Sequence, residues 1–274
     1  MKNKRRRFIR NLIATFSIGA FALISALIVS FFIKEGSSES TNFMAYTEYY
    51  ENEQSPIKSY TAPSRSYVKM STLYTYDGNN TFTATSATVT TSTNISIETA
   101  TDLVAFSRLC YQDNKYLTYK YNLIANIDCT GAPEFYPIGM KKTPFTGTFN
   151  GNGFDITGLR YLAIKNTNVS EAQAYINGGL TYYSMFVLNK GTIKNVGLIN
   201  PEMSLFYTAE GELTTVAPLV GENQAGGTVD HTYVKFLGDI ETVGLTASGG
   251  FFFAGLMAKN LGTFTNSYAA YDTF

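Results

Sequence analysis

The chain has 274 residues, and its 21 acidic and 21 basic residues give a formal net charge of zero. This average conceals an asymmetry, because all the acidic residues but only 14 of the basic ones lie in residues 35–274, which therefore carry a net charge of −7. Phosphate binding requires a basic surface, so this acidic region argues against a nucleic-acid-binding protein, and no nucleic-acid partner is predicted.

Residues 1–34 have the features of a targeting segment rather than of a folded domain. A basic cluster precedes an apolar run from Leu12 to Ile33 that contains no charged residue. As a helix this run would be about 33 Å long at about 1.5 Å per residue, enough to cross a hydrocarbon core of about 30 Å. The basic flank predicts that the N-terminal end stays in the cytoplasm and that the remainder is exported.

Two interpretations of this segment remain open. As an uncleaved signal anchor, it is a transmembrane helix that makes the protein a single-pass cell-membrane protein with its C-terminal part outside. Ala20-Phe21-Ala22 instead offers a cleavage site of the small-x-small type, although the apolar run continues beyond it. Cleavage would release a secreted or cell-surface protein, so both interpretations predict an extracellular location.

Residues 35–94 are rich in Ser, Thr, Asn, Tyr and Glu and contain few aliphatic side chains. Such a segment offers little apolar surface to offset the entropy lost on ordering, so we interpret it as a flexible stalk or linker. Alternating Tyr and Thr within it also predict short strands near residues 67–76, or an edge strand added to the domain that follows.

From Ile95 onward the sequence has the texture of a folded domain, predicted to cover residues 95–274. Thr99 and Asp102 have the spacing of a helix-capping box. Apolar residues follow at helical spacing, so one amphipathic helix of about a dozen residues is predicted to end near Asn114. The remainder reads as strands and turns, which predicts an all-β fold class.

Three segments of this domain resemble one another, and internal repeats of this kind decide the fold. In each, an apolar strand runs into an Asn, a Gly makes a bend, and a second strand alternates apolar and polar residues. Thr192, Thr228 and Thr263 mark the same position at intervals of 36 and 35 residues. Strands repeated in this way are expected to stack in parallel at about 4.8 Å. The sequence therefore predicts a short right-handed parallel β-helix, a solenoid with the helix as its N-terminal cap.

Two sets of equivalent residues are predicted to line up along this solenoid. The apolar set builds the core and consists of Ile193, Val229 and Phe264. The polar set lies two positions later and is predicted to form a structural ladder of hydrogen-bonded side chains: Asn195, His231 and Asn266. His231 is the only histidine, and its place in this set favours a polar core residue over a general base.

The stretch Phe-Thr-Gly-Thr-Phe-Asn-Gly-Asn-Gly at residues 145–153, together with the three repeats, resembles bacterial surface proteins that carry GLUG-type repeats. The usual core of that repeat reads Gly-Leu-Val-Gly, Asn, Gly-Thr-Ile, Asn, and the resemblance covers about residues 95–274. Similar β-helix regions occur in adhesins and in the N-terminal part of IgA-protease-like proteins. The first repeat departs from the pattern, with Met185-Phe186-Val187-Leu188 at its start. The resemblance implies a surface protein used for binding or adhesion.

No catalytic residue, metal or cofactor is predicted. The HExxH, GxSxG and P-loop patterns are absent, and the aspartates share no repeat position. Asn150–Asp155 loosely resembles a calcium loop, but Asn-Gly favours a tight turn. Cys110 and Cys129 either form a disulfide or are buried as thiols, and two cysteines with one histidine do not make a zinc site.

The predicted function is binding or adhesion by a membrane-anchored, extracytoplasmic module without catalytic activity, with carbohydrate or a cell-surface protein as ligand. Insertions at about 162–182, 201–215 and 238–250 fall between repeats, and they would form a binding surface if they emerge on one side. Phe206 and Tyr207 are the predicted contacts, against the alternative that the loops fold over the solenoid and bury Phe206.

Two other hypotheses stay open. One is a carbohydrate-active enzyme of the β-helix type, a polysaccharide lyase or hydrolase. The other is a structural or assembly module, shortened from a longer surface protein, that associates end to end because an uncapped solenoid exposes strand edges.

Overall fold

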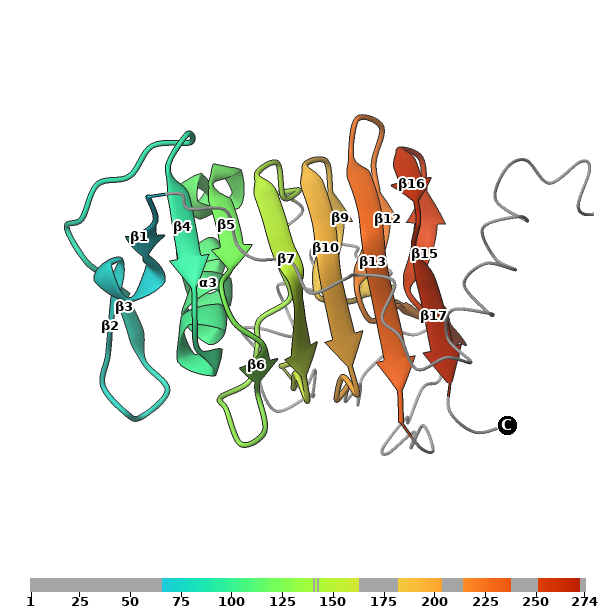
Figure 1. Cartoon of the computed structure of the whole chain (residues 1–274), viewed down its shortest axis with the longest axis horizontal. Coiled ribbons are helices and arrows are strands. Elements are labelled where there is room, and N and C mark those ends of the chain that lie inside the picture. The colour runs from blue at the N-terminus through green and yellow to red at the C-terminus, as the bar shows by residue number, and fades with distance from the viewer. Residues whose placement is uncertain are drawn as a thin grey trace, which may run out of the picture. The chain divides into compact units, whose positions relative to one another are not determined.

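The computed structural model describes residues 66–139, 141, 143–162, 182–203, 214–237 and 251–271 (Figure 1). The helical elements are α3 (Ala100–Gln112) and the 3₁₀ helices η1 (Met70–Thr72) and η2 (Asn114–Thr118). The strands are β1 (Val68–Lys69), β2 (Tyr74–Tyr76), β3 (Phe82–Ala84), β4 (Asn94–Ile97), β5 (Lys120–Leu123), β6 (Ile127–Asp128), β7 (Thr148–Thr157), β8 (Tyr182–Tyr183), β9 (Phe186–Asn189), β10 (Thr192–Ile199), β11 (Thr214–Val216), β12 (Val220–Asn223), β13 (Thr228–Phe236), β14 (Phe251–Phe253), β15 (Met257–Asn260), β16 (Thr263–Thr265) and β17 (Tyr268–Tyr271).

The described residues are mostly β-structure, and the largest sheet is parallel throughout. Its strands run in the order β1-β4-β5-β7-β10-β13-β16, with β6 beside β7 and β17 beside β13. Every neighbouring pair in it is parallel. The strands lie side by side across Figure 1. This confirms the predicted all-β class with parallel strands.

Two smaller parallel sheets accompany the large one. β8, β11 and β14 form the first, and β9, β12 and β15 form the second. Along the chain, one strand of the first small sheet, one of the second and one of the large sheet follow each other in this order three times. Parallel neighbours cannot be joined by a tight hairpin, so these two short strands supply the return path to the large sheet. Each such passage is called a level below.

The predicted register of the repeats is confirmed in the large sheet. Ile193 pairs with Val229, and Val229 pairs with Phe264. Ile193 and Val229 are fully buried, as the two-residue period of a strand requires for a core column. Threonines begin four consecutive strands in register: Thr148, Thr192, Thr228 and Thr263. β7 therefore adds one strand in the same register before the three recognised repeats.

A column of glycines lies where the chain turns into the strands of the large sheet. It consists of Gly147, Gly191, Gly227 and Gly262. A Cβ atom on Gly191 would collide with the carbonyl oxygen of Gly147, and one on Gly262 with that of Gly227. The Thr192 N–H donates to the same Gly147 oxygen at 2.9 Å, so successive levels are in backbone contact here. This close approach explains why each repeat has a Gly at its bend.

Helix α3 begins at the predicted capping box. The Thr99 hydroxyl accepts a hydrogen bond from the Asp102 N–H at 3.1 Å, and the Asp102 carboxylate accepts one from the Thr99 N–H at 3.2 Å. On the buried face of the helix, the Phe106 ring lies 4.2 Å from the Tyr121 ring and 5.7 Å from the Phe149 ring. These contacts pack α3 against residues of β5 and β7, and Figure 1 shows the helix behind β4 and β5.

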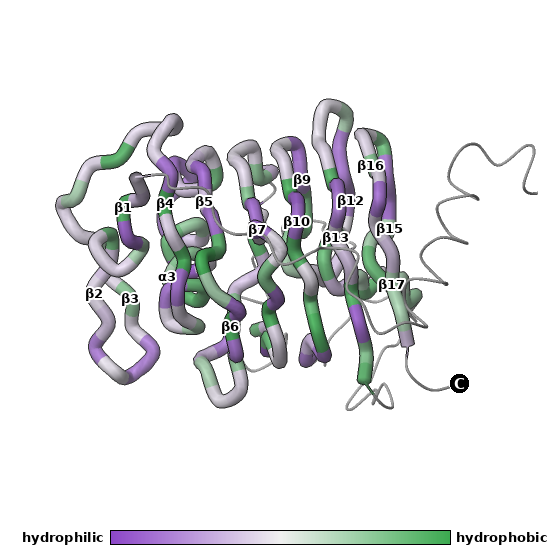
Figure 2. The backbone as a smooth tube through the Cα atoms, in the orientation of Figure 1, coloured by the Kyte–Doolittle hydropathy of each residue, from purple (hydrophilic) through white to green (hydrophobic). Residues whose placement is uncertain are grey.

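The parallel sheet begins before the predicted domain boundary at residue 95. β1 pairs with β4, with Val68 opposite Ile95. β2 and β3 form an antiparallel hairpin, whose tip is hydrophilic in Figure 2. Met70, Leu73 and Phe82 are buried in the core, and they supply the apolar surface that orders this segment. Residues 66–94 thus contain the predicted short strands and an edge strand, and they do not form a flexible stalk. Residues 35–65 lie outside the described residues.

The predicted transmembrane segment, residues 1–34, also lies outside the described residues. Within the part of the chain that the structure describes, no helix is both long enough and apolar enough to span a membrane. The anchor is therefore a prediction from the sequence.

Candidate functional site

The three predicted ladder residues occupy equivalent positions, but their backbone takes an unexpected conformation. Asn195, His231 and Asn266 have φ angles of 53°, 48° and 49°. This left-handed region is uncommon for residues other than Gly, and Asn is among those that enter it most readily. A left-handed residue interrupts the two-residue period of the strand. The following residues, Val196 and Thr232, are therefore the buried ones.

The side chains of these three residues do not bond to one another. Each bonds to a residue in the row of paired residues that comes just before its own. Asn195 Nδ2 donates to Asn150 Oδ1 at 3.1 Å. Asn266 Nδ2 donates to Asp230 Oδ1 at 3.0 Å, and His231 Nδ1 lies 2.9 Å from Asp230 Oδ2. The ladder predicted at Asn195, His231 and Asn266 is thus corrected, because the left-handed backbone turns all three away from the core.

The amide ladder lies in the sheet of β9, β12 and β15. Asn189 Nδ2 donates to Asn223 Oδ1, and Asn223 Nδ2 donates to Asn260 Oδ1, both at 2.8 Å. Asn189 and Asn223 are fully buried. The oxygens of Asn189 and Asn260 also accept the N–H of the glycine two residues later, Gly191 and Gly262. Asn189 and Asn260 therefore each hold their own bend, and the two amide–amide bonds tie the three levels together. The sequence signal was the Asn that ends the first strand of each repeat.

Asp230 organises the polar cluster around His231. Burial alone would raise the pKa of Asp230, but hydrogen bonds from Thr265, His231 and Asn266 outweigh it and lower the pKa. The Thr265 hydroxyl donates at 2.7 Å from the next level. His231 is half exposed and contacts Asp230, its own neighbour in β13, so it is a surface side chain. Asp230 is the residue that joins two levels, through Thr265 and Asn266.

Cys110 and Cys129 are separate, buried thiols. Of the two alternatives that the sequence left open, the unbonded one describes them. Burial raises the pKa of Cys129 to about 12 and also raises that of Cys110 well above its ordinary value. Such thiols are protonated at neutral pH and react poorly as nucleophiles.

The segment compared with a calcium loop lies inside β7. Asn152 and Gly153 have φ angles of 52° and 82° there, which is the tight kink expected from Asn-Gly. Asn152 Nδ2 donates to the Leu123 carbonyl at 2.8 Å, so this side chain is part of the internal bonding. Among the described residues, no group of three or more His, Cys, Asp or Glu side chains could hold a metal ion.

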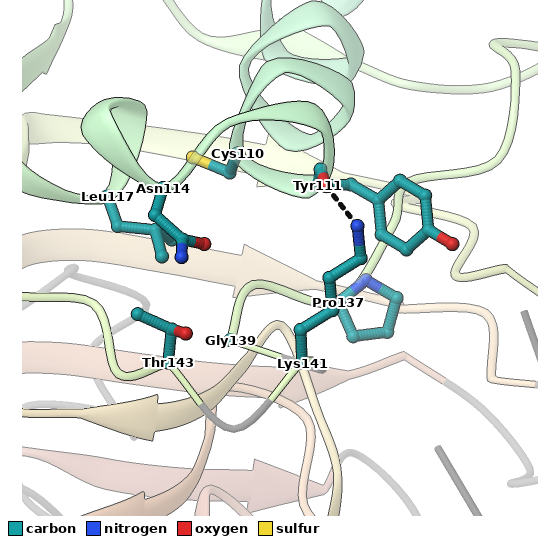
Figure 3. Close-up of a pocket in the computed structure, with 8 residues that line it drawn as sticks. All are labelled: Cys110, Tyr111, Asn114, Leu117, Pro137, Gly139, Lys141 and Thr143. Carbon is teal, nitrogen blue, oxygen red and sulfur yellow. Dashed lines mark hydrogen bonds between the residues drawn. The ribbon is translucent and has the colours of Figure 1, made fainter. Parts of the chain in front are cut away.

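A small hollow lies at the C-terminal end of α3 (Figure 3). Its volume is about 10 Å³, room for about one water molecule. Lys141 Nζ donates to the Tyr111 carbonyl at 2.7 Å beside it and lies 3.8 Å from the centre of the Tyr111 ring. A space of this size does not admit a sugar or an organic cofactor.

A partly buried carboxylate, Asp155, lies under an aromatic cover on the outer face of the large sheet. The Tyr233 hydroxyl donates to Asp155 at 2.6 Å, and the Tyr233 ring stacks on Tyr268 with centroids 5.5 Å apart. Gly197 lies on β10, between Asp155 on β7 and Tyr233 on β13. A Cβ atom on Gly197 would collide with both side chains. Burial raises the pKa of Asp155 more than the Tyr233 hydrogen bond lowers it.

Replacing Asp155 by Asn is expected to stabilise the protein at neutral pH. Because the folded-state pKa is raised, the contribution of Asp155 is most favourable below the unfolded pKa of about 3.9 and is lost as the pH rises through the folded value. Asn keeps an oxygen for Tyr233 without the partly buried charge. The urea midpoint of Asp155→Asn should exceed that of the wild type at pH 7 and approach it near pH 3.

Asp77→Asn is the control with the opposite sign. Hydrogen bonds from the N–H groups of Asn79 and Thr81 lower the pKa of Asp77. Its stabilising contribution is therefore present above the unfolded pKa and is lost as the pH falls through the folded value. Asp77→Asn should lower the urea midpoint at pH 7, and a lower midpoint for Asp155→Asn as well would count against the assigned direction.

The three predicted insertions leave the large sheet on one side, at the C-terminal ends of its strands. They follow β7, β10 and β13, which are neighbours in register, and they precede β8, β11 and β14, which are neighbours in one small sheet. Their roots are tied together, since the Gly158 N–H donates to the Ile199 carbonyl at 2.9 Å and the Asn200 N–H to the Lys235 carbonyl at 2.8 Å. The chain segments that lead into the three insertions therefore leave the sheet on the same side, as a shared binding surface would require.

Residues 163–181, 204–213 and 238–250 themselves lie outside the described residues. The predicted contacts Phe206 and Tyr207 fall within the second of these ranges, so the proposed contact role stays a prediction.

Phe252 is an exposed aromatic residue on this side that the sequence interpretation missed. It lies in one row with Tyr182 and Thr215, directly after the insertions, and is 59% exposed. Phe253, the next residue, packs against Phe236 with ring centroids 5.8 Å apart. The two-residue period of a strand turns Phe252 the other way. That alternation within the triple Phe run was the available signal.

Comparison with known proteins adds no assignment to this geometry. No protein-family model, no curated protein and no solved structure matches the chain.

Proposed function

We propose that the exported part of this chain is a short right-handed parallel β-helix of the GLUG-repeat type that binds a carbohydrate or a cell-surface protein. The solenoid is supported by the fixed order in which the chain visits the three sheets, with equivalent residues paired in each. Crossover connections between parallel strands are right-handed in nearly all proteins. Helix α3, packed against β5 and β7, serves as the N-terminal cap.

The observation that carries the binding role is the common side from which the three insertions leave. Binding residues are concentrated in loops that a rigid scaffold positions, and here three loop roots are joined by backbone hydrogen bonds. The undescribed parts of the insertions contain five acidic residues and one lysine. This charge favours a neutral or basic ligand over an acidic polysaccharide. Phe252 supplies an exposed aromatic face of the kind that sugars and protein side chains contact.

The proposal includes no reaction. Glycoside hydrolysis requires a matched pair of carboxyl groups. Asp155 pairs across the sheet with Gly197, whereas Asp230 pairs with Lys194. The two carboxylates therefore do not lie at equivalent positions of the repeat. Each carboxylate already accepts hydrogen bonds from neighbouring side chains, which is the behaviour of structural groups.

We place the module outside the cytoplasm, held by the segment of residues 1–34 as a single-pass anchor. The basic flank and the uncharged run from Leu12 to Ile33 support this orientation. Cleavage near Ala22 would give the same binding module in a secreted form.

The test is binding of the full chain, solubilised in detergent, to a glycan array and to intact cells. Phe252→Ala and the double variant Phe206→Ala with Tyr207→Ala should each weaken binding at least about tenfold, because central aromatic contacts carry much of an interface's affinity. Tyr76→Ala is the matched control, since it removes a 38% exposed aromatic residue from the β2–β3 hairpin. Failure to bind any glycan or cell, or an equal loss with Tyr76→Ala, would contradict the proposal.

A further inference from the structure

In the described part of the chain, each of the three parallel sheets ends with an edge strand, unpaired on its outer side, that comes from the C-terminal residues. These edge strands are β14, β15 and β16 with β17. An edge strand presents unpaired N–H and C=O groups, which pair readily with another strand. Three such edges side by side form one surface, called the open end here.

Inward-facing side chains lose their cover at the open end. At one inward position of the first small sheet, Tyr183 and Val216 are 1% and 6% exposed, whereas Phe253 is 40% exposed. Phe264 in the large sheet and Met257 in the second small sheet are only partly buried, although their neighbours one level earlier are fully buried. The core therefore continues to the surface of this end.

The last level also lacks the charges that usually protect an edge strand. Lys259 is the one charged residue in the range 251–271, and it bonds to Glu222 of the preceding level at 3.1 Å. Along β17, Figure 2 shows pale green to white residues. Natural edge strands normally carry charges, Pro or bulges that prevent pairing. Their scarcity here indicates an edge that is covered in use.

The amide ladder reaches the open end with a donor that faces outward. Asn260 Oδ1 accepts hydrogen bonds from Asn223 Nδ2 and from the Gly262 N–H. In both earlier levels the side-chain nitrogen donates to the next Asn oxygen, whereas Asn260 Nδ2 has no acceptor among the described residues. The ladder is thus directional, and any further level must offer an oxygen acceptor at this height.

This direction argues against a second copy of the chain as the occupant. Two open ends related by a two-fold axis would bring the Asn260 donors against each other. Among the described residues, the opposite end of a second copy offers no strand for the second small sheet, because Ile138 and Phe145 contact β9 only as single bridges. Phe106 of α3 packs behind them, with its ring 6.3 Å from that of Phe145.

We propose that the open end binds an extended segment of a partner protein, which adds a parallel strand next to β15. The segment carries few charges, alternates apolar residues toward the core, and places an Asn or Gln oxygen to accept from Asn260. Strand addition of this kind takes its affinity from backbone hydrogen bonds and its specificity from alternate side chains. The proposal rests on the register and the ladder, and it is independent of the ligand proposed for the insertions.

The test uses the full chain in detergent and, as probe, a synthetic peptide with the sequence of residues 214–237. This sequence already stacks between two levels of its own kind, with Asn223 in the ladder. The peptide should bind and slow amide hydrogen exchange in β15, β16 and β17 at least about tenfold. Asn260→Asp keeps the acceptor for Asn223 but removes the outward donor, and it should weaken peptide binding by about tenfold.

A peptide that carries Asn223→Leu is the matched control and should bind about as weakly to the wild-type chain. Tight binding of this control peptide would overturn the proposal, as would protection confined to other strands. Dimers seen in sedimentation that persist in Asn260→Asp would assign the open end to a second copy and would also overturn it. Absence of both peptide binding and self-association would show that the open end takes no strand.

Discussion

Gly191→Ala is expected to destabilise the protein by roughly 3 kcal/mol or more. The new Cβ would overlap the carbonyl oxygen of Gly147 and approach the carbonyl carbon of Thr146 to 2.7 Å. Both are backbone atoms. Moving them apart would break the hydrogen bond from Thr192 to Gly147 at 2.9 Å and disturb the one from Thr228 to Gly191 at 2.8 Å. The free energy of unfolding, measured by urea denaturation of the full chain, gives the size of this loss.

The control for this substitution is Gly226→Ala. Gly226 has a φ of 89° but nothing within 4 Å of its Cβ position. Alanine there meets only the conformational penalty of a left-handed residue, about 1 kcal/mol. Gly191 itself has no positive φ, so its loss must come from the overlap with Gly147. If Gly191→Ala costs no more than Gly226→Ala, close contact between levels would not explain the glycine column.

The glycine column and the apolar column were predictable because both residue types recur at the same position in each repeat. Each repeat places a Gly before the second strand, and Ile193, Val229 and Phe264 then follow at a fixed offset. Register in a parallel stack is specified wherever one face is buried, since a shift by one residue would expose the whole apolar set. The pairing of these three residues therefore followed from the pattern alone.

The ladder was misplaced because the two-residue period was carried through Asn195. A left-handed residue breaks that period, and Asn occurs both in such positions and in ladders, so residue type alone does not separate the two. The backbone was needed to see that Val196, and not Asn195, continues the inward face. The Asn before each Gly bend belonged to the recognised pattern, but its role as the ladder depended on how the small sheets stack.

The earliest strands of the large sheet were not recognised as part of the stack, for a different reason. β4 and β5 pair in register with each other and with β7, yet their sequences do not share the repeat. α3 provides much of the apolar surface at their inner side, with Phe106 against Tyr121, so these strands need no small-sheet partners. Tertiary packing determines them. For the insertions, the sequence showed only their order along the chain, and the register of β7, β10 and β13 was needed to place their roots on one side.

Asn223→Leu is expected to cost roughly 3–5 kcal/mol of unfolding free energy, because several buried polar groups would lose their partner at once. Asn223 is fully buried. It accepts from Asn189 Nδ2 at 2.8 Å and donates to the Thr263 carbonyl at 3.0 Å as well as to Asn260. Leucine fills a similar volume, so the loss would come mainly from unsatisfied hydrogen bonds and little from a cavity. Urea denaturation of the full chain measures it.

His231→Asn distinguishes this ladder from the one predicted at Asn195, His231 and Asn266. His231 is half exposed and left-handed, and Asn adopts that conformation more readily than most residues. The substitution should therefore change the unfolding free energy by no more than about 0.5 kcal/mol. A larger loss at His231 than at Asn223 would mean that the outer column holds the levels together. The reverse order places the cohesion of the stack in buried amides that bond from one level to the next, which is also what leaves Asn260 as an open donor.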